Sequence, residues 1–132
     1  MTATTGTVTF SFGDSPAMAD ELLALVLAGT KTATCGARRD FGPGKDAPPV
    51  VGRRDIVLDG AGRPAAIIET VEVTIRRFGE MDQQFAYDEG EGFRTLAHWR
   101  EGHRDFFERN GGWSEDLELI CERFRLIEVL PR

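Results

Sequence analysis

The residues best suited to chemistry are one lysine, two threonines and three glutamates, found in three short stretches of the sequence. The stretch 29–34 reads Gly-Thr-Lys-Thr-Ala-Thr and surrounds the lysine with hydroxyl groups. A threonine hydroxyl is a weak nucleophile until a base takes its proton, and a lysine does this where its surroundings lower its proton affinity. A carboxylate opposite would orient the lysine or move protons. The candidates are Lys31, Thr32, Thr34, Glu69, Glu89 and Glu91.

Spacing alone does not make these residues catalytic. A surface lysine beside strand threonines explains the stretch 29–34 more simply than a site does. Glu69 is the one carboxylate on an otherwise apolar strand face, which fits a buried partner for an arginine as well as a site residue. His98 and His103 are five residues apart and do not share a helix face, so we expect no metal pair there.

Local signals place the stretch 29–34 where a helix ends and a strand begins. Asp14 or Ser15 is expected to cap a helix that starts at Pro16, and Gly29 suits its left-handed end. Thr95 is expected to cap a second helix, which ends before the glycines at 111–112. Glycines interrupt the acidic segment 80–91 near its end and predict a loop there. Alternating apolar residues predict strands over 8–12, 30–35, 55–58, 64–78 and 117–130.

The order of these elements predicts an α+β fold with a mixed or antiparallel sheet, bent into a small barrel and flanked by two main helices. In the last strand the apolar alternation changes phase at Glu122-Arg123, which predicts a bulge there. The segment 36–52 is rich in glycine and proline and reads as a long loop.

Composition indicates one soluble domain over residues 1–132, with 41% hydrophobic and 29% charged residues. No apolar run is long enough to cross a bilayer, and residues 1–6 lack the features of a signal peptide. We therefore expect a cytoplasmic protein without a membrane partner. Cys35 and Cys121 are too few for a disulfide framework or a metal cluster, and we expect both to pack as small apolar side chains.

The charge is uneven along the chain. The net charge is −6, yet residues 31–54 contain six basic and two acidic side chains. That segment carries +4, so the remainder carries −10. An acidic protein gains little from counterion release on long nucleic acids. One basic loop still suits a small anion or a few phosphates, although a solvated charged loop explains the charge alone slightly better.

The order and spacing of several segments resemble the ASCH-domain proteins of the PUA-like superfamily, and most closely a longer bacterial subgroup with a Glu-Gly-Glu-Gly segment. The resemblance spans nearly the whole chain and implies a PUA-like β-barrel with a cleft for RNA or a modified nucleoside. The segments that carry it are 12–16, 29–34, Gly52, 57–60, 68–70 with Val73, 85–87, 89–92, Leu96, 99–100, His103, 106–107 and 122–124.

Two activities follow from the resemblance. One is metal-assisted cleavage of single-stranded RNA, in which Lys31 stabilises phosphate charge and the acids bind a divalent metal or move protons. The other is hydrolysis of the amide in N4-acetylcytidine by a Lys-x-x-Thr pair and a glutamate. These correspond here to Lys31, Thr34 and Glu89, with Glu91 as the alternative glutamate. Lys31 would activate Thr34, and Glu89 would handle the leaving-group proton.

A third interpretation is a noncatalytic module that binds RNA or a nucleotide, although acids in the cleft would repel phosphates. We rank RNA cleavage first and amide hydrolysis second. The sequence departs from the family where arginines replace aromatic residues after Cys35, which favours phosphate contacts over base stacking. No cofactor is implied except the divalent metal of an RNA-cleaving enzyme, and nothing indicates a protein partner. The expected substrate-binding residues are Thr32, Arg38, Arg39 and Arg53.

Overall fold

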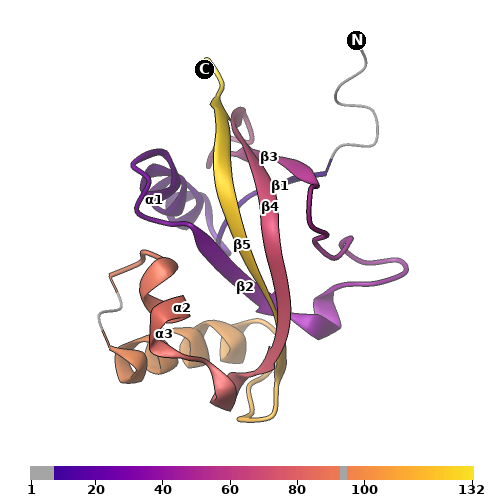
Figure 1. The fold of residues 1–132 in the computed structure, drawn as a ribbon, viewed down its shortest axis with the longest axis vertical. Coiled ribbons are helices and arrows are strands. Elements are labelled where there is room, and N and C mark those ends of the chain that lie inside the picture. The colour runs from indigo at the N-terminus through magenta and orange to yellow at the C-terminus, as the bar shows by residue number, and fades with distance from the viewer. Residues whose placement is uncertain (1–7, 93–94) are drawn as a thin grey trace.

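A computed structural model describes residues 8–92 and 95–132. Its five strands form one mixed sheet in the order β1-β3-β4-β5-β2. β1 runs parallel to β3, and the other neighbours are antiparallel. Figure 1 shows β4 and β5 as long, curved strands, with the helices on one side of them. The strands are β1 (Thr9–Phe10), β2 (Ala33–Ala37), β3 (Arg54–Leu58), β4 (Pro64–Arg77) and β5 (Glu118–Val129).

The helices begin at the caps that the sequence predicts. The Ser15 side chain accepts a hydrogen bond from the Met18 amide, and α1 (Pro16–Leu27) follows. Thr95 caps α3 (Leu96–Arg109) in the same way. A short helix that the sequence analysis did not predict, α2 (Gln83–Asp88), is capped by Asp82, which accepts from the Phe85 amide. No helix in the described part of the chain is long and apolar enough to cross a membrane.

These elements confirm the expected α+β fold with a mixed sheet and two main helices, and correct it in detail. The first strand pairs only over Thr9–Phe10, because the chain leaves the sheet at Ser11. β2 begins at Ala33 rather than at Thr30, because the amide of Thr32 donates to Asp88 instead of to a strand.

The bulge expected at Glu122-Arg123 lies on the partner strand. β5 keeps successive residues there, while β4 inserts Val71 between the residues that pair with Phe124 and Arg123. The change of phase in the last strand therefore marks the right place in the sheet but the wrong strand of the pair. Two short 3-10 turns complete the fold, at Arg38–Asp40 and Phe78–Glu80.

Two hydrophobic clusters pack on the sheet. One joins α1 to β3 and β4 through residues such as Leu23, Val57 and Ile68. The other joins α2 and α3 to β2 and β5 through Phe78, Trp99 and other large side chains. Lys31 lies just after the end of α1, and Glu89 and Glu91, which contact it, lie just after the end of α2.

Candidate functional site

The corner after α1 turns Lys31 into the protein. Gly29 adopts a left-handed backbone with φ of 79°. The Thr30 amide donates to the Leu25 carbonyl and the Gly29 amide to the Val26 carbonyl, the hydrogen-bond pattern of a Schellman helix end. This fixed turn places the next residue, Lys31, among the most deeply buried side chains of the protein, at 1% exposure.

The acidic loop after α2 packs directly on this corner. Thr32 donates through its amide to the Asp88 carbonyl at 2.9 Å and through its hydroxyl to the same oxygen at 3.3 Å. Gly90 has a positive φ of 69°, and a Cβ there would overlap the Thr30 carbonyl and the Lys31 Cα. Only glycine allows so close an approach, so Gly90 lets the loop carry its two glutamates to the lysine.

Three acceptors surround the Lys31 ammonium group. Its Nζ donates to the Ala33 carbonyl at 2.8 Å, to the Glu89 carbonyl at 3.2 Å and to the Glu91 carboxylate at 2.6 Å. An ammonium group has three N–H donors, so this set occupies all of them. Lys31 is therefore held as a charged donor, and it can serve as a base only after a proton moves to Glu91.

Glu89 is buried beside this pair and is held by α3. Its Oε1 lies 2.6 Å from Trp99 Nε1 and 2.8 Å from His103 Nε2. Burial alone would raise the pKa of Glu89, but the charge and hydrogen bond of His103, with smaller effects of Lys31 and Trp99, hold that pKa below its usual range. Burial opposes the charged form of His103 too, yet Glu89 raises the pKa of His103 above its usual value.

Two cavities meet at Thr34 and Cys35. The cavity of about 350 Å³ contains Glu89, Glu91 and His103 in its wall. The cavity of about 250 Å³ lies on the other side, under the loop 41–49. The two cavities adjoin, because four residues line both of them, and we refer to the pair as the cleft. The shared residues are Phe12, Gly13, Thr34 and Cys35.

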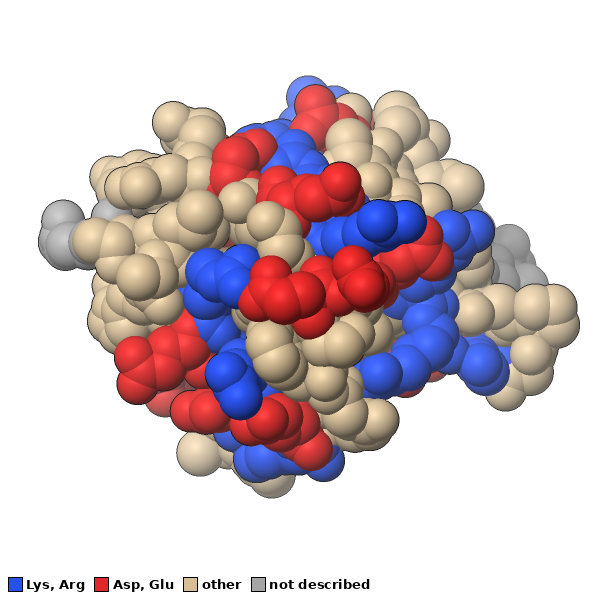
Figure 2. Space-filling model, turned by 90° about the horizontal axis from the view of Figure 1, so that it is seen from below, with Lys and Arg blue, Asp and Glu red and all other residues tan. Residues whose placement is uncertain are grey.

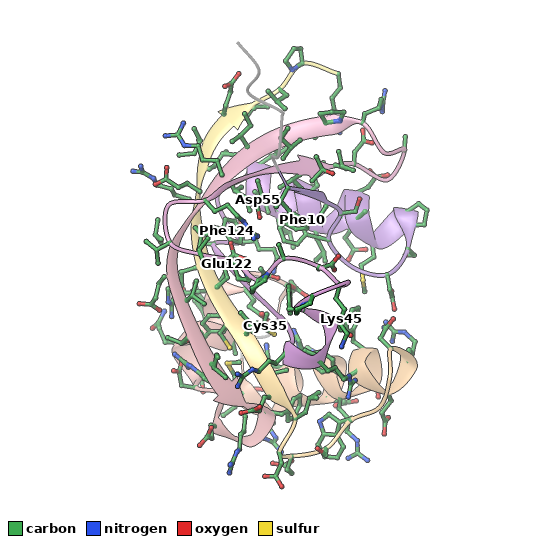
Figure 3. All side chains as sticks on the ribbon, turned by 90° about the vertical axis from the view of Figure 1, so that its right-hand side faces the viewer. Phe10, Cys35, Lys45, Asp55, Glu122 and Phe124 are labelled. Atoms are coloured by element: carbon green, nitrogen blue, oxygen red, sulfur yellow. The ribbon has the colours of Figure 1, made fainter. Side chains whose placement is uncertain are left out.

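Figure 3 shows Cys35 and Glu122 on adjacent strands, with Asp55 and Phe10 above them, and all four residues line the smaller cavity. The Arg53 guanidinium group donates two hydrogen bonds, of 2.7 and 2.8 Å, to the Asp55 carboxylate. Glu122 accepts from the Thr70 hydroxyl at 2.5 Å. Burial, with the nearby charge of Asp55, raises the pKa of Glu122 although Thr70 opposes the shift.

The structure gathers some of the predicted residues and separates others. Lys31, Glu89 and Glu91 lie together, while Thr34 and Arg53 line the cleft. The remaining four make contacts elsewhere. Thr32 faces solvent and donates to the Asp88 carbonyl, and Arg38 pairs with Glu118. Arg39 donates to the carbonyls of Asn110 and Gly112, and Glu69 pairs with Arg54 and Arg125.

Sequence reasoning missed the part of the site that α3 and β5 supply. The spacing of His103 to His98 indicates no metal pair, yet His103 pairs with Glu89 and lies close to Cys35, and both of these residues come from other elements. Cys121 packs in the core as expected, whereas Cys35 lines both cavities. The sulfur of Cys35, a carboxylate oxygen of Glu89 and a ring nitrogen of His103 all lie within 4.8 Å of one another and could hold a metal ion.

Comparisons with known proteins agree with this fold. The family model of the ASCH domain matches residues 8–128. The solved structure of protein EF3133 from Enterococcus faecalis has 34% identity and a TM-score of 0.83, over 92% of this chain and 77% of that one. An ASCH domain from Lactobacillus crispatus has 31% identity and a TM-score of 0.82, over 90% of this chain and 78% of that one.

A more distant structure, a point mutant of the ASCH protein of Zymomonas mobilis, has 12% identity and a TM-score of 0.52, over 94% of this chain and 73% of that one. This likeness extends only to the fold. A comparison with curated proteins finds no match. The family model spans most of the sequence, and the two closer structures share about a third of their residues with it, so the chain belongs to the ASCH-domain family.

Proposed function

We propose that this ASCH domain binds a modified nucleoside derived from RNA and hydrolyses an acyl amide on its base, as in N4-acetylcytidine. The observation that carries the proposal is the buried ion pair of Lys31 and Glu91, 2.6 Å long, beside a cleft lined by Thr34. A threonine that must attack a carbonyl needs a nearby group to take its proton. The family is RNA-related, which supports a ligand of this class.

The size of the cleft favours a nucleoside over a nucleic-acid strand. Its two parts, of about 250 and 350 Å³, are at the lower end of small-molecule sites. The charge favours the same choice, because acidic side chains outnumber basic ones in the walls. Both arginines there, Arg53 and Arg109, are already paired with aspartates. The phosphodiester backbone of RNA would therefore enter walls whose arginines are already paired, whereas an uncharged nucleoside needs no such cation.

The protein surface supports this preference. On the face shown in Figure 2, acidic and basic side chains are interspersed. Arg38 and Arg39, from the basic segment, use their guanidinium groups in contacts with Glu118 and with main-chain carbonyls. Mixed charge of this kind gives weak steering toward a polyanion. RNA affinity of the intact domain is therefore expected to be low and to depend only weakly on salt, because few phosphates would be neutralised.

The proposed chemistry divides the proton transfers between the lysine and one glutamate. The Thr34 hydroxyl attacks the acetyl carbonyl, and its proton passes to the Lys31–Glu91 pair. The Lys31 charge stabilises the oxyanion. The C–N bond then breaks, the exocyclic amine of cytidine leaves with the proton from Glu91, and water hydrolyses the acetyl-threonine ester to acetate. Glu89, kept ionised by Trp99 and His103, holds the site in place instead of donating a proton.

A second function, metal-assisted cleavage of single-stranded RNA, is favoured by one observation. Cys35, Glu89 and His103 place three metal-ligand atoms at the same cleft. In that reaction Lys31 would stabilise phosphate charge and a bound metal would activate water. The two functions make different predictions, because RNA cleavage stops when a chelator removes the metal, whereas attack by Thr34 does not depend on one.

The test is to incubate the protein separately with N4-acetylcytidine and with single-stranded RNA, each with and without a chelator. Release of cytidine and acetate that resists the chelator supports amide hydrolysis. Thr34→Val should reduce that rate about 100-fold or more, in the range expected when proton-transfer chemistry is lost. Thr32→Val is the matched control, because Thr32 lines neither cavity, and it should retain most of the rate. Equal rates for the two variants would refute the role of Thr34.

A further inference from the structure

Three side chains that the proposed reaction does not use as nucleophile or base form a compact donor set. We propose that Cys35, Glu89 and His103 bind one zinc ion. Their sulfur, oxygen and nitrogen donors lie within 4.8 Å of one another. They come from β2, the end of α2 and α3, so the set exists only in the folded chain. Thiolate, carboxylate and imidazole together are a ligand set typical of zinc.

The distances are close to those that zinc needs. Zinc bonds of about 2.0–2.3 Å in tetrahedral geometry place neighbouring donors about 3.4–3.6 Å apart. The Oε1 of Glu89 and the Nε2 of His103 are now 2.8 Å apart and share a hydrogen bond. A metal replacing that shared proton would need the two groups to separate by about 0.6–0.8 Å. The other two donor pairs, which also lie within 4.8 Å, would have to adopt the same spacing.

The imidazole is already oriented as a metal ligand. His103 Nδ1 lies 3.1 Å from the Trp99 carbonyl one helical turn earlier. Donation from Nδ1 to a carbonyl is the usual way in which proteins fix a histidine so that Nε2 faces a metal. The Trp99 indole stacks on the imidazole, with ring centroids 4.2 Å apart, and donates to Glu89 at 2.6 Å. One buried tryptophan thus positions two of the three ligands.

The exchange of protons for metal keeps the charge balanced. Both nitrogens of His103 face oxygen acceptors, so the ring is a cation paired with the Glu89 carboxylate, and Cys35 beside them is a neutral thiol. Binding zinc releases the proton on Nε2 and the thiol proton. Two positive charges leave as one doubly charged ion enters, and the net charge of the set stays at zero. Charge-neutral exchange limits the cost of placing a metal in a buried site.

A fourth coordination position would face the cleft. Cys35, Glu89 and His103 all contribute to the wall of the 350 Å³ cavity. Three protein ligands and one open position distinguish catalytic zinc sites from structural ones, which are closed by four. Lys31 lies nearby, but its charge is balanced by Glu91 at 2.6 Å. The zinc would therefore be able to hold water or a ligand oxygen in the same cleft.

Cobalt(II) titration of chelator-treated protein tests the site, because a cobalt–thiolate bond gives a charge-transfer band. The expected result is one cobalt per chain, displaced by zinc, with two protons released per metal in calorimetry across buffers of different ionisation enthalpy. Cys35→Ser should remove the charge-transfer band, and His103→Gln should weaken binding about 10- to 100-fold or more. The matched controls are Cys121→Ser and His98→Gln, which should bind as the unmodified protein does.

Absence of stoichiometric cobalt uptake by the unmodified protein would overturn the proposal without any mutant. Uptake that survives Cys35→Ser with its charge-transfer band, or that is lost equally in Cys121→Ser, would overturn the ligand assignment. Circular dichroism of each variant establishes that it is folded. The inference does not rest on the proposed amide hydrolysis. Zinc binding without hydrolysis of N4-acetylcytidine would support the metal site and refute the proposed function. Hydrolysis without zinc binding would refute the metal site and support the proposed function.

Discussion

Two buried glutamates, one on either side of Thr34 and Cys35, have pKa values that are shifted in opposite directions. Glu89, exposed to 1%, is surrounded by Trp99, His103 and Lys31, and its pKa is lowered. Glu122, exposed to 7%, receives one hydroxyl hydrogen bond and lies near Asp55, and its pKa is raised. Burial disfavours the carboxylate in both, so the number and charge of the neighbouring donors decide the outcome.

The comparison teaches that the cleft has two chemically different ends. One end carries an ionised glutamate, a cationic histidine and a buried ion pair. The other end carries Glu122, whose pKa is raised, and Asp55, which forms an ion pair with Arg53. Pairs of titratable groups whose pKa values are pushed apart are characteristic of sites that run acid–base chemistry. Lys31 acts on both ends. Its charge contributes to the lowered pKa of Glu89, and it opposes, without cancelling, the rise in the pKa of Glu122.

Removal of Lys31 should break this arrangement most severely. Lys31→Met leaves Glu91 and two carbonyl groups without their donor, and breaking a buried pair by removing one partner costs about 3–5 kcal/mol of unfolding free energy. Urea unfolding measures the loss. The double variant Lys31→Met with Glu91→Leu should recover part of it, because no unpaired charge remains. A loss no larger than in Lys45→Met, an exposed control, would contradict the account.

Gly90 tests the Glu89 end alone. In Gly90→Ala the new Cβ would overlap the Thr30 carbonyl, and the positive φ adds strain, so we expect a loss of about 3 kcal/mol. Gly92→Ala is the matched control: its φ is also positive, but a Cβ there meets nothing within 4 Å, and about 1 kcal/mol is expected. Thermal unfolding compares the two. Equal losses would show that the loop does not pack tightly on the corner.

The pH dependence of stability tests the Glu122 end of the cleft. Its unfolded carboxyl titrates near 4.5 and its folded pKa is higher, so the folded state binds more protons between the two values. Stability therefore falls as the pH rises through that window, and Glu122→Gln should gain stability relative to the unmodified protein with rising pH. Urea unfolding from about pH 4 to about pH 8 checks this. A parallel pair of pH profiles would contradict the raised pKa, and Glu101→Gln, at an exposed position, serves as the control.

Much of the fold could be predicted because its signals are local. Ser15 and Thr95 cap their helices with their own side chains, and Gly29 ends α1 with the backbone that glycine favours. The α+β class followed from the order of these elements. The missed helix α2 has only six residues, and most of its support comes from Phe85 and Ala86 buried against other elements, which no local pattern reveals.

The site was predictable only in part, because its contacts join residues that lie far apart in the sequence. The meeting of Lys31 with the acidic loop agreed with the expectation drawn from the family resemblance. The roles of the two glutamates did not follow from the sequence: Glu91 takes the ion pair, while Glu89 pairs with His103 on a helix that begins several residues later. Arg38 and Arg39 lie in the basic segment, yet the structure directs them to α3 and β5 instead of the cleft. Charge along the chain does not say where each side chain points.

The most direct test of the central claim is to locate the acyl group during turnover. The protein is mixed with N4-acetylcytidine, quenched with acid at short times and digested, and the peptides are analysed by tandem mass spectrometry. The account predicts one acetyl group on Thr34, formed more slowly in Glu91→Gln because Glu91 protonates the leaving amine, and absent in Thr34→Val. Acetate release without any acetyl-threonine, or an acetyl group on the neighbouring Cys35, would contradict it.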